Sequence, residues 1–106
     1  KILDVAVDLR KKSKTFGRAY SILLTDKNCK SVFIPKGFAH GFLTLGAENI
    51  VCYSCTEYRS IGNERCLFYK DPFLKIKWPT TKFITTKKDA LAKNLSELIE
   101  DKIIKI

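Results

Sequence analysis

The sequence predicts an all-β fold of sandwich or barrel type, followed by one C-terminal amphipathic helix. Two observations lead to this prediction. Short apolar segments alternate with clusters of turn residues every ~8–12 residues, a spacing typical of antiparallel sheets rather than of βαβ units. After Trp78 and Pro79, apolar residues recur instead at helical spacing. The 106 residues provide for one domain. We divide it into a β-barrel part, residues 1–78, and a C-terminal extension with the helix, residues 79–106.

Six short strands are expected. In chain order they cover residues 3–9, 16–24, 31–34, 39–45, 50–58 and 66–69. The first strand alternates apolar and polar residues like a half-buried strand, with Asp4 and Asp8 on the face opposite the apolar side chains. Turn residues at 25–28 and 46–49 predict hairpin connections.

The C-terminal helix is expected at residues 91–99, because apolar residues recur there every three or four positions. These residues are Leu91, Leu95, Leu98 and Ile99. Asp89 or Thr86 is the expected N-terminal cap of this helix.

Composition narrows the class of protein. The net charge of +9 arises from 20 basic and 11 acidic residues, and the lysines are scattered as on a solvated surface rather than clustered as in nucleic-acid-binding proteins. Apolar runs are far shorter than the ~20 residues of a membrane-spanning helix. The N-terminal residues lack the pattern of a signal peptide, so a cytoplasmic protein is expected. Because the sequence contains no methionine, we expect it to be a fragment.

The cysteines do not predict a metal or redox site. Cys52 and Cys55 have the spacing of a CxxC motif, but residues three apart on a strand point to opposite faces. We expect buried free thiols in a reducing compartment. His40 is the only histidine, whereas metal sites in β-barrels usually contain two or three, so no metal centre is expected.

Two residues have alternative interpretations from the sequence alone. His40 lies between glycines in Gly-Phe-Ala-His-Gly, where the backbone can approach a ligand closely, but a lone strand histidine is often structural. Tyr53 is a packing residue in most strands of this kind, or a general acid if it faces a polar pocket.

Several segments together resemble the dTDP-4-dehydrorhamnose 3,5-epimerase family. They are Leu-Asp-Val-Ala-Val-Asp-Leu-Arg (3–10), Ser-Lys-Thr-Phe-Gly (13–17), Ile-Pro-Lys-Gly-Phe-Ala-His-Gly-Phe (34–42), Tyr-x-Cys-Thr-Glu-Tyr (53–58) and Ile-Lys-Trp-Pro (76–79). The resemblance extends from residue 1 to about residue 91. It implies a cupin-type jelly roll, usually a homodimer that exchanges strands.

The resemblance also implies roles for six residues. Tyr53 matches the general acid, and Asp89 matches the carboxylate that orients the catalytic histidine. The residues that match substrate contacts are His40, Glu64, Lys88 and Tyr58, with Tyr58 as a stacking partner for the base. The implied substrate is a dTDP-4-keto-6-deoxyhexose of deoxysugar and polysaccharide synthesis, and the implied reaction requires no cofactor. Nucleic acid and membrane are not expected partners.

The implied reaction begins with removal of a proton next to the keto group and ends with protonation from the opposite face, while positive groups stabilise the enolate. The family's proton-abstracting histidine lies in a Leu-Arg-Gly-Leu-His type of motif that these residues do not contain. We therefore expect at most trace epimerase activity from this chain alone. A non-catalytic sugar-nucleotide-binding or dimerisation module and a single-centre 3- or 5-epimerase are the alternatives.

Overall fold

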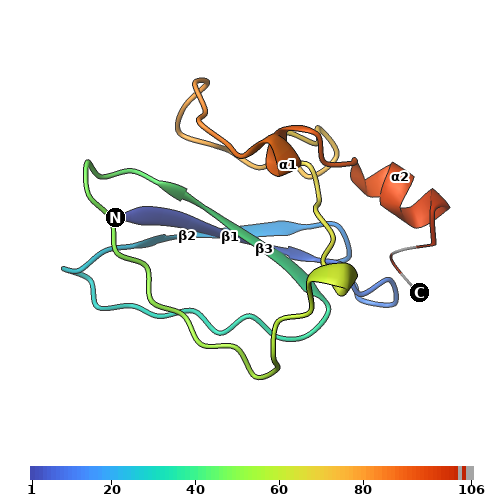
Figure 1. The fold of residues 1–106 in the computed structure, drawn as a ribbon, viewed down its shortest axis with the longest axis horizontal. Helices are drawn as coiled ribbons and strands as arrows, with labels where there is room; N and C mark the ends of the chain where they lie inside the picture. The colour runs from blue at the N-terminus through green and yellow to red at the C-terminus, as the bar shows by residue number, and fades with distance from the viewer. Residues whose placement is uncertain (103, 105–106) are drawn as a thin grey trace.

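A three-stranded antiparallel sheet forms the centre of the fold (Figure 1). The computed structural model describes residues 1–102 and 104. The strands are β1 (Ile2–Asp8), β2 (Ala19–Leu24) and β3 (Phe38–Thr44), in the spatial order β2-β1-β3. The short helices are η1 (Ile61–Asn63), α1 (Lys87–Ala90) and α2 (Leu95–Glu100). The first, second and fourth predicted strands are confirmed, and the described chain is dominated by its sheet with few helical residues.

The central strand β1 is buried on both faces, so the prediction of a half-buried strand is wrong. Val5 and Val7 are 3% and 4% exposed on one face, and Asp4 and Asp8 are 5% and 2% exposed on the other. β1 pairs with a strand on each side, which leaves it no edge toward solvent. A carboxylate in such a position is stable only when hydrogen bonds replace the lost hydration.

Asp8 obtains those hydrogen bonds from the turn that follows β1. Arg10 donates to Asp8 from Nε and Nη2, both at 3.0 Å. The hydroxyls of Ser13 and Thr15 donate to Asp8 Oδ2 at 2.6 and 2.5 Å. The Arg10 guanidinium and then the two hydroxyls hold the pKa of the Asp8 carboxyl well below its usual range, although burial opposes them. Asp8 therefore organises the connection between β1 and β2.

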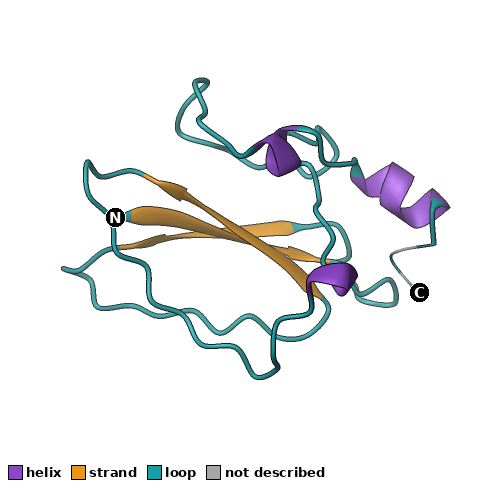
Figure 2. Ribbon diagram, viewed as in Figure 1, coloured by secondary structure: helices purple, strands orange, loops and turns teal. Residues whose placement is uncertain are grey.

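Three of the predicted strands are not formed. Residues 31–34, 50–58 and 66–69 run as loops, apart from one isolated bridge between Leu67 and Lys93 (Figure 2). In the first two segments, apolar residues are exposed where no sheet covers them, as in Phe33 at 80% and Ile50 at 95%, whereas residues 66–69 are half-buried. Alternation creates a strand only where a neighbouring backbone supplies hydrogen bonds, and in the described residues these segments have no such ladder.

The predicted single helix is instead two separate short helices. Thr86 caps α1, since its hydroxyl oxygen accepts the backbone N–H of Asp89 at 3.2 Å. Between α1 and α2, the carbonyl of Lys93 accepts the backbone N–H of Phe68 at 2.9 Å. The Lys93 carbonyl is thus bound to a distant segment, and Asn94 after it has the extended backbone of a helix N-cap, so the helix is interrupted here. Leu91 is consequently 72% exposed, outside the apolar stripe that was expected to include it.

The core lies between the sheet and the C-terminal segment. It consists of Val5, Val7, Leu74, Leu95, Leu98 and Ile104. The buried carboxylate of Asp71 accepts the backbone N–H of Leu95 at 2.7 Å and that of Phe73 at 3.0 Å, and thereby joins the start of α2 to the preceding turn. Figure 1 shows α1 and α2 on one side of the sheet. Within residues 1–102 and 104, no helix has the length and apolar character needed to cross a bilayer.

Candidate functional site

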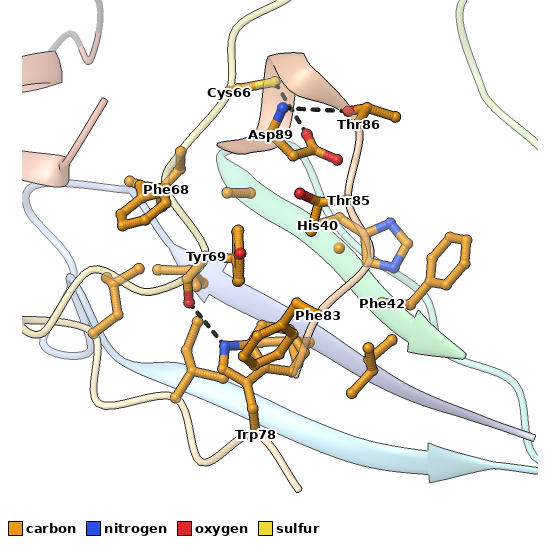
Figure 3. Close-up of a pocket in the computed structure, with 18 of the residues that line it drawn as sticks. His40, Phe42, Cys66, Phe68, Tyr69, Trp78, Phe83, Thr85, Thr86 and Asp89 are labelled. Atoms are coloured by element: carbon orange, nitrogen blue, oxygen red, sulfur yellow. Dashed lines mark hydrogen bonds between the residues drawn. The ribbon is translucent and has the colours of Figure 1, made fainter. Parts of the chain in front are cut away.

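A groove of about 650 Å³ runs along the free edge of β3 (Figure 3). Its other wall is formed by residues 65–69 and 83–86. Most of the lining is apolar or aromatic, and the polar side chains that reach it include His40, Cys66 and Asp89. An apolar cleft with a few polar groups is the usual form of a small-molecule site.

His40 of β3 forms a pair with a buried aspartate. Its Nε2 lies 2.8 Å from Oδ2 of Asp4, and the two side chains come from adjacent strands, because Ala6 is the register partner of His40 and Asp4 that of Phe42. The Asp4 side chain is 7% exposed and that of His40 is 39% exposed. Nε2 is therefore engaged with Asp4, and Nδ1 is the ring nitrogen outside this contact.

Asp89 lies on α1 at the rim of the groove. Its backbone N–H is held by Thr86, and its Oδ1 is 3.8 Å from the Cys66 thiol, which donates to it (Figure 3). Cys66 is partly buried, whereas Cys29, Cys52 and Cys55 are exposed free thiols. The prediction that all of the cysteines are buried is therefore wrong. The reason is that the segment carrying Cys52 and Cys55 is a loop without a sheet to cover it.

A cluster of charges adjoins Asp89. Oε2 of Glu64 accepts a hydrogen bond from Lys88 Nζ at 3.1 Å, and both carboxylate oxygens of Glu64 accept from the Arg59 guanidinium. The hydrogen bonds from Arg59 and then Lys88 lower the pKa of Glu64 to about 2. Glu64 in turn raises the pKa of both Arg59 and Lys88. At neutral pH the cluster is therefore fully ionised, with two cations to one anion.

The structure groups the predicted site residues in three places. Glu64, Lys88 and Asp89 lie together around the start of α1, and His40 lies on β3 in the groove. Tyr53 is 78% exposed on the loop after β3 and lies near Arg59. Tyr58 is fully exposed and makes none of the hydrogen bonds of the cluster.

Three residues of this site were not predicted from the sequence. Asp4 is separated by 36 positions from its partner His40, and no local pattern connects the two. Cys66 was considered only as a free thiol. Arg59 had a usable signal, because it precedes Glu64 by five residues across a turn that contains Gly62 and Asn63, where opposite charges readily meet.

Fold and site together define a sheet-based protein with an open groove, a histidine paired with a buried aspartate, and an adjoining charged cluster. The chain matches the family model for dTDP-4-dehydrorhamnose 3,5-epimerase over residues 1–97. It therefore belongs to the dTDP-4-dehydrorhamnose 3,5-epimerase family, and the resemblance noted in the sequence is confirmed.

Individual relatives agree with this assignment. Over 78 residues, 74% of the chain and 42% of the relative, it is 49% identical to a dTDP-4-dehydrorhamnose 3,5-epimerase of Methanothermobacter thermautotrophicus. It is 38% identical to an enzyme of that name from Escherichia coli over 104 residues, 97% of the chain and 56% of the relative. The chain thus spans about half the length of the curated relatives it matches.

A solved structure shows the same fold. The chain superposes on the crystal structure of a dTDP-6-deoxy-D-glucose-3,5-epimerase from Legionella pneumophila with a TM-score of 0.85 and 39% sequence identity. The match covers 97% of this chain and 55% of that one. That enzyme was crystallised in complex with dTDP-4-keto-L-rhamnose.

Proposed function

We propose that this chain supplies substrate-binding and acid groups for epimerisation of a dTDP-linked 4-keto-6-deoxy sugar, in the synthesis of dTDP-rhamnose and of polysaccharides such as lipopolysaccharide. The contact of Glu64 with Lys88, beside Asp89, carries this proposal, because three residues that the family resemblance assigns to the site converge there. The sugar nucleotide named for the Legionella structure supports the class of substrate.

In the proposed reaction, the keto group acidifies the hydrogens on the neighbouring ring carbons. A base removes one of them, and the resulting enolate is stabilised by positive charge and hydrogen-bond donors. His40 within the groove and Lys88 beside it are the proposed substrate contacts. Tyr53 then protonates the opposite face of the same carbon as general acid. Asp89 would orient the catalytic base, and Tyr58 would stack on the nucleotide base.

The finer description of the fold is part of the same proposal. We expect residues 1–106 to form one cupin-type domain, in which the open edges of β2 and β3 join a jelly roll and α2, with Leu95 and Leu98 buried, is the C-terminal amphipathic helix. Exposed apolar side chains such as Phe33 and Ile50 support a homodimer, since large uncovered apolar residues mark contact surfaces. Exposed free cysteines support a reducing, cytoplasmic location. The proposed epimerisation uses no cofactor.

A non-catalytic sugar-nucleotide-binding or dimerisation module is the second candidate. The observation in its favour is the position of Tyr53, which is 78% exposed and does not line the groove. A 3- or 5-epimerase acting at one centre would use the same residues. These alternatives differ in whether solvent deuterium enters the sugar, and at which carbon.

Binding of dTDP, followed by NMR of the labelled chain, tests the proposed site. We expect saturable shifts at Lys88, and we expect Lys88→Ala to weaken binding about tenfold, as for loss of a charge-assisted hydrogen bond. Lys77→Ala is the matched control, because Lys77 is also exposed and makes none of the ion pairs found in the described residues. No saturable binding, or equal loss in the two variants, would contradict the proposal.

Deuterium exchange separates the candidate functions. With the dTDP-4-keto-6-deoxy sugar in D2O, we expect the chain alone to exchange C3 and C5 only at trace level and Tyr53→Phe to abolish that trace. Equal residual exchange in both proteins would favour the non-catalytic module. Exchange at one carbon alone would favour a single-centre epimerase.

A further inference from the structure

We propose that Arg59 is a positioning residue that holds Glu64 at both carboxylate oxygens, so that Lys88 is free to leave Glu64 and bind a phosphate group of the ligand. The phosphate-bearing ligand is taken from the proposed function. The role of Arg59 toward Glu64 rests on the two hydrogen bonds that join these side chains.

Arg59 makes a two-point contact with the carboxylate. Its Nε donates to Oε1 of Glu64, and its Nη2 donates to Oε2 at 3.3 Å. A planar guanidinium bound in this way fixes the plane of a carboxylate as well as its charge, which a lysine ammonium does not do. Glu64 is the more buried partner, with a side chain 28% exposed against 73% for Arg59.

The backbone around this ion pair is closed by its own hydrogen bonds. Arg59 and Glu64 flank η1, in which Asn63 N–H donates to the Ser60 carbonyl at 3.0 Å and Glu64 N–H donates to the Ile61 carbonyl at 3.2 Å. The Asn63 side-chain amide also donates to the Ser60 hydroxyl at 3.0 Å. The turn brings Arg59 and Glu64 together, so the orientation of Glu64 is set before any ligand arrives.

Lys88 is attached much more loosely. It makes a single contact of 3.1 Å, with Oε2 of Glu64, and its side chain is 57% exposed. A flexible lysine with one exposed contact can exchange that partner at small cost. When it does, Arg59 still neutralises Glu64. The other ionisable side chains beside the cluster include Asp89, Cys66 near Lys88, and Tyr53 near Arg59.

Without Arg59, Lys88 would be the partner of two anions, the Glu64 carboxylate and the phosphate group of the ligand. Lys88 would be the remaining partner of the Glu64 carboxylate in this cluster, and a phosphate group would compete with Glu64 for it. The ligand would then lose binding energy although it never touches Arg59. Substitution of Arg59 should therefore change both the titration of Glu64 and the affinity for the ligand.

The ligand-free test is the titration of Glu64, followed by NMR of its side-chain carboxyl carbon. In the wild type its pKa is about 2, and we expect Arg59→Gln to move it most of the way toward the ordinary value of ~4.3. Arg59→Lys should give an intermediate value, because it keeps the charge and loses the two-point contact. Arg18→Gln is the matched control, since it removes an exposed arginine outside the cluster and should leave Glu64 unchanged.

The second test measures the affinity of the same proteins for dTDP. We expect about tenfold weaker binding in Arg59→Gln, partial recovery in Arg59→Lys, and less than about a twofold change in Arg18→Gln. An unchanged Glu64 titration in Arg59→Gln, or dTDP affinity equal to wild type in that variant, would overturn the role of Arg59 while leaving the proposed function intact. If the wild-type protein does not bind dTDP, the proposed function and the release of Lys88 are both overturned. The Glu64 titration then tests only the contact between Arg59 and Glu64.

Discussion

Leu95→Ala is expected to lower the free energy of unfolding by about 2–5 kcal/mol, a large share of the ~5–15 kcal/mol typical of a domain. Leu95 is 2% exposed at the start of α2 and packs in the cluster with Val5 and Val7 of β1. Its removal leaves a cavity between the helix and the central strand. Urea unfolding followed by circular dichroism measures the loss as a lower midpoint at unchanged slope.

Leu91→Ala is the control for this prediction. It deletes the same atoms from a leucine that is 72% exposed, so we expect a change of less than about 0.5 kcal/mol. A single helix over residues 91–99 would instead place both leucines on one apolar stripe. Similar losses in the two variants would therefore contradict the two-helix arrangement.

Asp8→Asn is expected to lower the midpoint of thermal unfolding by roughly 10 °C or more at pH 7. Every side-chain group that contacts the Asp8 carboxylate is a donor, including Arg10 and the hydroxyls of Ser13 and Thr15. An amide in its place would point an NH2 group at these donors and would leave the Arg10 charge without its partner. Asp26→Asn, in the exposed turn after β2, is the control and should change the midpoint little.

Asp8→Asn should also alter the dependence of stability on pH. Folding lowers the pKa of Asp8, so the folded state favours the ionised form and Asp8 stabilises the protein above the unfolded pKa of ~3.9. That contribution is lost as the pH falls below this value toward the folded pKa. We therefore expect the wild type to lose stability more steeply than Asp8→Asn between about pH 5 and pH 2. Parallel curves would show that Asp8 contributes no linked stability.

Much of the sheet was predictable from local patterns. The alternation in residues 3–9 and the apolar residues of 16–24 and 39–45 gave three strands that the structure contains as β1, β2 and β3. The family resemblance was also carried by continuous segments of sequence, and the match over residues 1–97 confirms it. Both kinds of prediction succeed because they depend on residues that are close in the chain.

The predictions of the other three strands and of the helix were wrong for a common reason. Apolar alternation in residues 50–58 indicates a strand only if another backbone pairs with it, and pairing is a property of the whole fold. The helical spacing of residues 91–99 is similarly overruled by a contact with the distant residue Phe68, whose N–H binds the carbonyl of Lys93. Propensity is a weak guide wherever such long-range hydrogen bonds compete with it.

The sequence by itself therefore determined the family, the three strands of the sheet and the types of residue available for the site. The tertiary structure alone decided which of them are partners: Asp4 with His40, Asp71 with the start of α2, and Glu64 with Lys88 across 24 positions. The physical reason is that burial and hydrogen bonding act between groups that are close in space. Strand register and chain reversal create that closeness, and neither is encoded in any local stretch of residues.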